Sequence, residues 1–276
     1  MVYGNPKEAL LCGSDLVEVN IEDCVDKLGF NYGRWQPWKA AAEQLIANPD
    51  LTRFESSILS DFYKKWSFPL IAKVFSEKIE DEKIRNHLLK VFHGNFMPFC
   101  NHSESDINSL VTNWTTYIES DNINSGHDLT LDQSINQDGT WTRAKGEIEL
   151  KRLSRLISSV RQHGYQRNDS ADGNILAYAL EKGQRTQYLV VSGLHRMAVL
   201  AALGNKKVII RLTVATIVHN RSVDIWPLVK SNVYTKDDAL SYFNHLFNFD
   251  TSPWDNLGFH RLDLNMKKNS NERKNS

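Results

Sequence analysis

The stretch that most constrains this chain runs from Gln187 to Leu212 and reads Q-Y-L-V-V-S-G-L-H-R-M-A-V-L-A-A-L-G-N-K-K-V-I-I-R-L. It opens with a short apolar run rich in β-branched residues, which is typical of a buried strand. From His195 the apolar residues follow a helical period, and Gly204 stands where a helix C-terminus favours glycine. A second β-branched run, Val208 to Leu212, follows. The pattern predicts a strand, a glycine turn, a helix and a strand, joined as a crossover unit.

The turn of this unit has the chemistry of an anion site. Gly193 lets the backbone approach a ligand closely, and the first N–H groups of the helix have no partner within the helix. The helix dipole adds partial positive charge, and His195 and Arg196 add donors. These features favour a bound phosphate group. The alternative is a tight structural turn whose His and Arg are solvated or paired with acids.

The S-G-L-H-R turn, its alanine-rich helix, the glycine and the β-branched strand together resemble the ParB/sulfiredoxin superfamily. Ser159-Val160 and Gly164-Tyr165 are similar to the element that precedes the hairpin in ParB-like domains. This resemblance covers residues 147–212. More loosely, the whole chain resembles larger ParB-like proteins of bacterial surface-polysaccharide gene clusters. That likeness is carried by Trp226-Pro227, Val229, Tyr234-Thr235, Ala239 and Phe243.

The resemblance implies an α+β fold with a small mixed-sheet core of the ParB/sulfiredoxin type. We expect this nucleotide-binding core, with a C-terminal helix, to occupy residues 126–250. A mainly helical region precedes it over residues 1–125. An extension covers residues 251–276, and from about residue 267 it contains only polar residues, which predicts disorder.

Apolar periodicity predicts the individual helices outside the turn. They cover residues 39–47, 54–66, 79–93, 149–163 and 236–247. Residues 175–180 and 187–191 flank the segment E-K-G-Q-R and predict a β-hairpin. Residues 97–139 are rich in Asn, Ser, Asp and Gly, so we expect mostly loop there.

Composition sets the broad class. The 276 residues are 41% hydrophobic and 24% charged, which is typical of a soluble globular protein. The 33 Lys and Arg balance 33 Asp and Glu, so no net field attracts nucleic acid or an acidic membrane. Three cysteines without a C-x-x-C pair fit a reducing cytoplasm. We expect no signal peptide and no membrane span.

Two further groupings have alternative interpretations. Cys100 and His102 lie close together, but no second pair at ligand spacing accompanies them, so we expect no metal site. Tyr32, Trp35 and Trp38 form an aromatic loop. Such a loop either anchors itself in the core or stacks on a sugar or base.

Departures from the family patterns narrow the chemistry. Sulfiredoxin-like enzymes carry a cysteine before the motif His, where this chain has Leu194, so sulfinic-acid reduction is not expected. The free-serine-kinase branch carries Asp at the first motif position, where this chain has Ser192. ParB proteins proper continue into a helix-turn-helix DNA-reading domain, and this sequence shows no clear counterpart.

The function predicted from the resemblance is a nucleotide-dependent kinase that phosphorylates a small hydroxyl compound, a sugar or a hydroxy amino acid. The resemblance implies ATP or CTP with Mg²⁺ as cofactor. The alternatives are a non-catalytic nucleotide-binding regulator or scaffold and, less favoured, a DNA-binding partition-type protein. Candidate phosphate-binding residues are Ser192, Gly193, Leu194, His195, Arg196 and Arg152. Candidate catalytic residues are His195 and the carboxylates Glu147, Glu149 and Asp128.

Overall fold

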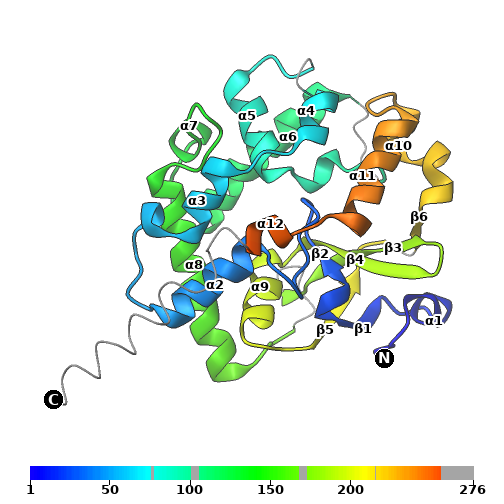
Figure 1. Cartoon of the computed structure of the whole chain (residues 1–276), viewed down its shortest axis with the longest axis horizontal. Helices are drawn as coiled ribbons and strands as arrows, with labels where there is room; N and C mark the ends of the chain where they lie inside the picture. The colour runs from blue at the N-terminus through cyan, green and yellow to red at the C-terminus, as the bar shows by residue number, and fades with distance from the viewer. Residues whose placement is uncertain (76–77, 101–105, 168–172, 215, 256–276) are drawn as a thin grey trace.

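The computed structural model describes residues 1–75, 78–100, 106–167, 173–214 and 216–255 (Figure 1). It confirms the α+β class, with one mixed six-stranded sheet and many helices. The strands are β1 (Leu16–Asn20), β2 (Cys24–Val25), β3 (Leu176–Lys182), β4 (Arg185–Ser192), β5 (Lys207–Leu212) and β6 (Val218–His219). Their order is β1-β5-β3-β4-β2, and β6 pairs with β3.

The predicted hairpin is confirmed, because β3 and β4 pair antiparallel around a turn at Gly183. The predicted crossover unit is wrong in its arrangement. The chain does pass from β4 through α9 (Leu194–Ala202) to β5, but β3 lies between these two strands. Since β3 is antiparallel to β4 and parallel to β5, β4 and β5 run in opposite directions.

The sheet is strongly curled. Its outermost strands, β1 and β2, are joined only by the short 3-10 helix η1 (Ile21–Asp23). A connection of this length does not reach across a flat sheet of this order, so the two ends of the sheet approach each other. A small core fills one face, where Val190, Ile210 and Met197 lie among its buried residues.

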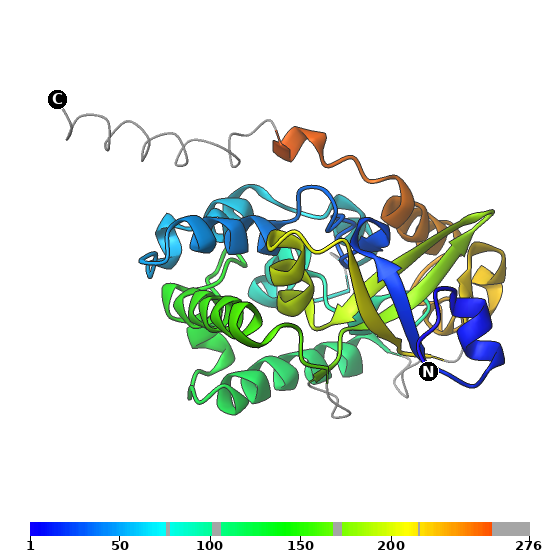
Figure 2. The same cartoon turned by 90° about the horizontal axis from the view of Figure 1, so that it is seen from below.

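Helices form most of the remaining regular structure of the described chain (Figures 1 and 2). Before the sheet core they are α1 (Pro6–Leu11), α2 (Pro37–Ala47), α3 (Ile58–Lys65), α4 (Pro69–Phe75), α5 (Glu82–Val91), α6 (Ile107–Asn124), α7 (Leu131–Ser134) and α8 (Arg143–His163). After it they are α10 (Pro227–Lys230), α11 (Lys236–Asn248) and α12 (Ser252–Asp255). The helices share a large second core that includes Leu180 and Leu189 of the sheet.

The helix predicted over residues 54–66 is divided. A 3-10 turn, η2 (Phe54–Ser56), precedes Ser57, whose side chain caps the start of α3. The predicted loop over residues 97–139 is wrong from residue 107 onward, because α6 and α7 lie there. Leu110, Trp114 and Ile118 follow one another at a spacing of four residues and are buried. This apolar stripe was not recognised in the sequence because polar residues separate its members.

α8 begins earlier than predicted. Thr142 caps it by accepting a hydrogen bond from the Lys145 N–H, so the helix gains its first turns before Glu149. Gly146 lies against the ring of Phe54 so closely that a Cβ there would fall 2.1 Å from the Phe54 ring. This contact brings the start of α8 against η2, and α2, α8 and α9 pack against one another beside the sheet (Figure 2).

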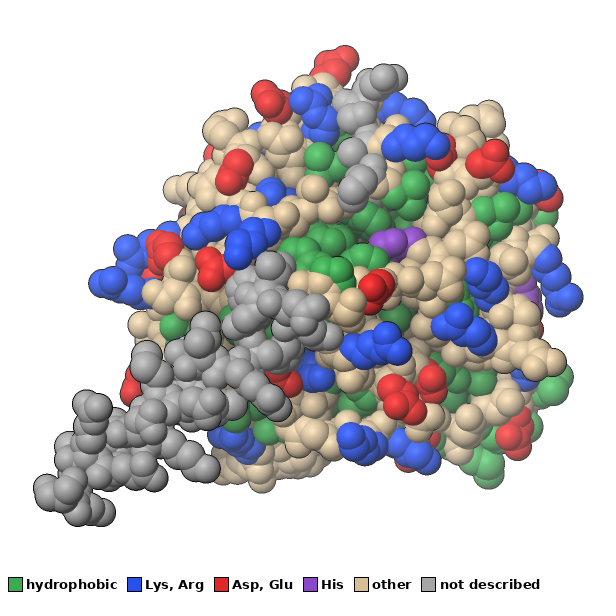
Figure 3. All heavy atoms as spheres, in the orientation of Figure 1, with side chains coloured by type: hydrophobic (Ala, Val, Ile, Leu, Met, Phe, Trp, Pro, Cys, Tyr) green, Lys and Arg blue, Asp and Glu red, His purple; other side chains and the backbone are tan. Residues whose placement is uncertain are grey.

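The predicted boundary between residues 125 and 126 falls just after α6. However, β1 and β2 precede this boundary and belong to the same sheet as β3 to β5. The predicted disordered segment from residue 267 lies outside the described residues. Among the described helices, none is both long enough and apolar enough to cross a membrane. Lys, Arg, Asp and Glu side chains are interspersed on the face in Figure 3, and apolar side chains gather near its middle.

Candidate functional site

The candidate site lies at the N-terminus of α9. Gly193 is its N-cap residue, in the left-handed region at φ +72°, and no side chain of the described residues caps this helix end. A Cβ at Gly193 would lie 3.0 Å from the Asn174 carbonyl oxygen and from the Ile175 Cα. Glycine is therefore required here by conformation and by space. The N–H groups at the start of α9 remain directed outward, as an anion site requires.

His195 is the chemically active side chain of this helix end. Its Nε2 lies 3.5 Å from Oε2 of Glu149, which projects from α8. On the other side the Trp38 ring of α2 meets the imidazole edge-on, with ring centroids 4.3 Å apart. Three helices therefore fix the ring of His195, while its side chain keeps 26% of its surface exposed.

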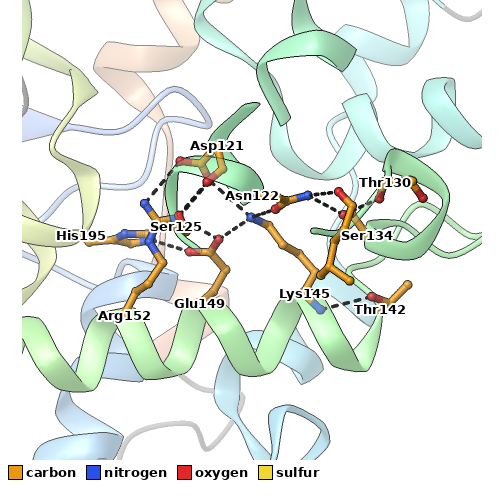
Figure 4. Close-up of polar contacts among 11 residues, drawn as sticks. Asp121, Asn122, Ser125, Thr130, Ser134, Thr142, Lys145, Glu149, Arg152 and His195 are labelled. Atoms are coloured by element: carbon orange, nitrogen blue, oxygen red, sulfur yellow. Dashed lines mark hydrogen bonds and ion pairs between the residues drawn. The ribbon is translucent and has the colours of Figure 1, made fainter. Parts of the chain in front are cut away.

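Glu149 is held by two cations on the same oxygen. Lys145 Nζ lies 2.7 Å and Arg152 Nη1 lies 3.2 Å from Oε1. The second oxygen, Oε2, is left to face His195. The three residues of α8 occur at positions i, i+4 and i+7, which places them on one face of the helix. Figure 4 shows this face directed toward His195 and α6.

A fourth helix, α6, completes the cluster. Asp121 accepts two hydrogen bonds from the Arg152 guanidinium, at 2.9 and 3.3 Å. Asn122, which is fully buried, accepts a hydrogen bond of 2.8 Å from Lys145 Nζ. These contacts tie the C-terminal turn of α6 to the first half of α8 (Figure 4).

The protonation states follow from the charges around the pair. Burial alone would raise the pKa of Glu149, but His195, Lys145 and Arg152 outweigh burial, so the pKa lies below its ordinary value. Burial lowers the pKa of His195, and the attraction of Glu149 only partly opposes this. At neutral pH the pair is therefore an ionised carboxylate beside a neutral imidazole. With the Nε2 proton facing Glu149, Nδ1 carries the free lone pair of a base.

The opposite side of the helix end carries basic residues. Arg196 Nη1 donates to the Asn174 carbonyl oxygen at 3.3 Å, and Ile175 N donates to the Tyr165 hydroxyl at 3.1 Å. Arg196 and Arg167 both act on Tyr165, since each lowers the pKa of its hydroxyl while burial raises it. Arg167 Nη1 is buried and has no hydrogen-bond partner within the described ranges.

The structure brings together only some of the predicted residues. Glu149 reaches His195, whereas Glu147 lies on another face of α8 and pairs with Arg143 at 2.8 Å. Asp128 is exposed after α6 and makes no contact with His195 among the described interactions. Arg152 reaches the site, but its guanidinium is engaged by Asp121 and Glu149 rather than free for a phosphate.

The two remaining predicted residues frame the turn. Ser192 ends β4 as an exposed residue, and Leu194 starts α9 and packs at the edge of the smaller core. Leu194 therefore contributes its backbone N–H rather than its side chain to the helix end.

Five residues of the site were not predicted: Lys145, Asp121, Asn122, Tyr165 and Arg167. Of the predicted aromatic loop, Tyr32 and Trp35 are buried in the core, and Trp38 lies against His195. A local signal existed for Lys145. Lys145 stands four residues before Glu149, which is the spacing of a helical ion pair, but the predicted helix began only at Glu149. Asp121 and Asn122 lie in a segment predicted as loop, so nothing placed them beside α8.

A resident Mg²⁺ does not fit these residues. Mg²⁺ takes carboxylate oxygens and waters in near-octahedral geometry. The nearest carboxylates, Glu149 and Asp121, already bind Lys145 and Arg152. Within the described residues there is no group of three or more His, Cys, Asp or Glu that could hold a metal ion. Cys100 is buried, with Sγ 3.4 Å from the Tyr178 hydroxyl, and His102 lies outside the described residues.

The chemistry of the site therefore follows from its own geometry. The ParB/sulfiredoxin resemblance stays a prediction, carried by the turn and the elements around it. No family model, no curated protein and no solved structure matches this chain.

Proposed function

We propose that this protein binds a nucleoside triphosphate at the N-terminus of α9 and transfers its terminal phosphoryl group to the hydroxyl of a small molecule. One observation carries the proposal: the buried carboxylate of Glu149 lies 3.5 Å from Nε2 of His195 at a helix end that favours anions. A carboxylate that orients an imidazole is a recurrent arrangement for a general base.

The phosphate groups are assigned to the basic side of the helix end. The N–H groups of Leu194 and His195, the guanidinium of Arg196 and the unpartnered Nη1 of Arg167 supply donors there. Guanidinium groups suit phosphate oxygens because their N–H donors match in pairs. Gly193 permits the left-handed turn that presents these donors, because a Cβ there would lie 3.0 Å from the Asn174 carbonyl oxygen.

Every proton and bond of the proposed phosphoryl transfer can be accounted for with these groups. His195 Nδ1 takes the proton of the acceptor hydroxyl, and the acceptor oxygen forms a bond to the terminal phosphorus. The bond between that phosphorus and the oxygen bridging to the second phosphate breaks, which releases a nucleoside diphosphate. Glu149 stabilises the imidazolium that forms, and Arg196 offsets negative charge on the transferred group.

The second candidate is a nucleotide-binding regulator without turnover. It is favoured by Ser192, which brings no carboxylate to the turn, and by the ion pairs that occupy Glu149 and Asp121. Such a module would bind the nucleotide at the same helix end and change its affinity for a partner.

The test is a turnover and thermal-shift panel with ATP, CTP and GTP, each with Mg²⁺. It includes mixtures of sugars and hydroxy amino acids and a parallel sample with duplex DNA. Turnover that depends on one small acceptor supports the phosphotransferase. Stabilisation without turnover supports the regulator, and turnover stimulated by DNA supports a partition-type protein. No response to any nucleotide contradicts nucleotide binding at this turn.

Two variants separate binding from chemistry. Arg196→Ala should abolish nucleotide binding in a calorimetric titration, whereas Arg161→Ala, at an exposed position near the end of α8, should not change it. Undiminished affinity in folded Arg196→Ala would contradict the site. His195→Asn should keep nucleotide affinity and lose turnover, because it removes the base without touching the arginines.

A further inference from the structure

The ammonium group of Lys145 is the most enclosed charge in the cluster. Lys145 has 2% of its surface exposed, and its Nζ meets Glu149 Oε1 at 2.7 Å, Asn122 Oδ1 at 2.8 Å and Asp121 Oδ2 at 3.4 Å. An ammonium has three N–H donors, so these three acceptors occupy all of them. Lys145 therefore has no donor left for a ligand and is not itself a catalytic residue.

The position of Lys145 determines which oxygen of Glu149 is available. Lys145 and Arg152 both bind Oε1, so Oε2 is the oxygen that faces His195. Asn122 fixes Lys145 in turn, and its own Nδ2 donates to the Leu129 carbonyl oxygen and to Ser134 Oγ. The Lys145 ammonium that binds Glu149 is thus held in place by residues of α6 and α7, which lie outside the sheet core.

We propose that Lys145 is a positioning residue that keeps Glu149 ionised and its Oε2 turned toward His195, while the positive charge of Lys145 itself opposes protonation of His195. Only the predicted effect of Lys145 on turnover rests on the proposed function. The arrangement of the pair itself is testable without any nucleotide.

The charges around His195 determine the direction in which its pKa should change when Lys145 is replaced. Glu149 and Asp121 favour its protonated form, whereas Lys145 and Arg152 oppose it. Two further groups of the described residues lie beside the pair and do not titrate near neutral pH: the Trp38 ring of α2 and the Tyr63 hydroxyl of α3, whose pKa burial raises. Removing the Lys145 charge should therefore make the Glu149–His195 pair take up a proton at higher pH.

The decisive experiment follows the imidazole of His195 by NMR in protein with isotope-labelled histidine. The signal is assigned by its loss in His195→Asn. In Lys145→Met, which replaces the charged side chain by an uncharged one of similar length, the titration midpoint of His195 should rise. Lys151→Met removes a charge from the exposed face of the same helix and should leave the midpoint unchanged. An unchanged midpoint in folded Lys145→Met overturns the proposal.

If Lys145→Met does not fold, Asn122→Ala provides the same test without changing the charge. It removes the acceptor that holds Nζ, so the midpoint should rise by a smaller amount than expected for Lys145→Met, and an unchanged midpoint again overturns the proposal. Where the panel above detects turnover, the acidic limb of its pH profile should move upward with the NMR midpoint. If the midpoint shifts but the protein shows no turnover, the positioning role of Lys145 is supported and the proposed phosphotransferase activity is contradicted.

Discussion

Two carboxylates of this protein are equally buried and behave in opposite ways. Asp26 and Glu149 each keep 5% of their surface exposed. Burial raises the pKa of Asp26 to about 6, whereas the pKa of Glu149 lies below its ordinary value. The difference therefore does not come from the depth of the two groups.

The partners of the two groups explain the contrast. Asp26 Oδ1 accepts hydrogen bonds from the N–H groups of Leu28 and Phe30, and Oδ2 accepts one from Gln36 Nε2. All three donors are neutral, so their hydrogen bonds do not fully compensate the carboxylate for the water that it loses on burial. The positive charge of neighbouring Lys27 lowers the pKa of Asp26 less than burial raises it. Glu149 instead faces Lys145 and Arg152 directly. Neutral hydrogen bonds suit a carboxylate that shapes a loop, and cations suit one that must stay charged beside a histidine.

The largest effect is expected where the ion cluster is broken. Glu149→Gln leaves Lys145 and Arg152 with Asp121 as their only carboxylate in the described cluster. Removing one partner of a buried ion pair costs about 3–5 kcal/mol. Urea unfolding at pH 7 measures this loss, and a loss below about 1 kcal/mol would mean that the cluster is solvated.

An intermediate effect concerns the pH dependence of Asp26. Its pKa is raised in the folded protein from 3.8 to about 6, so the folded state holds the proton more tightly. The corresponding stability is fully present below pH 3.8 and is lost as the pH rises through about 6. Relative to Asp26→Asn, which does not titrate, the wild-type protein should lose about 2 kcal/mol between pH 4 and pH 7.5.

For Glu149 the sign is opposite. Its lowered pKa contributes stability that is present above its ordinary value of 4.5 and is lost as the pH falls through the lower folded value. Comparison of wild type with Glu149→Gln should therefore show a difference that shrinks on acidification. The stability difference between wild type and Asp26→Asn and that between wild type and Glu149→Gln should therefore change with pH in opposite directions. If both changed in the same direction, the two carboxylates would not differ as proposed.

The smallest effect is expected at Glu147, which lies on the same helix as Glu149 and pairs with Arg143 in a partly exposed position. Glu147→Gln should change the unfolding free energy by no more than about 0.5 kcal/mol, because solvent screens such pairs. A change comparable with that of Glu149→Gln would mean that charge count on α8, rather than burial, controls stability.

The sequence predicted those parts of the fold that local patterns encode. Continuous apolar stripes indicated α2, α8 and α11, and the turn at Gly193 marked the candidate site. α6 was missed because its apolar residues are separated by Asn, Thr and Ser.

The inner half of the site depends on that missed helix. The pair of Lys145 with Glu149 is visible as helical spacing, but its burial is not, because Asp121 and Asn122 cover it from α6. The choice among Glu147, Glu149 and Asp128 likewise required knowing which face of α8 meets α9. Neither piece of information is present in a local pattern.

The curled sheet has a consequence for how this protein assembles. β1 and β2 come from one short segment, yet their partners are distant: Leu16 pairs with Arg211, and Val25 pairs with Leu189. Contacts so far apart along the chain form slowly, since the entropy of closing a long loop is lost before the contact is gained. On the ribosome the first strands emerge long before the hairpin and β5 exist. Assembly of the sheet, and with it the helix end that carries His195, must therefore wait until most of the chain has been synthesised.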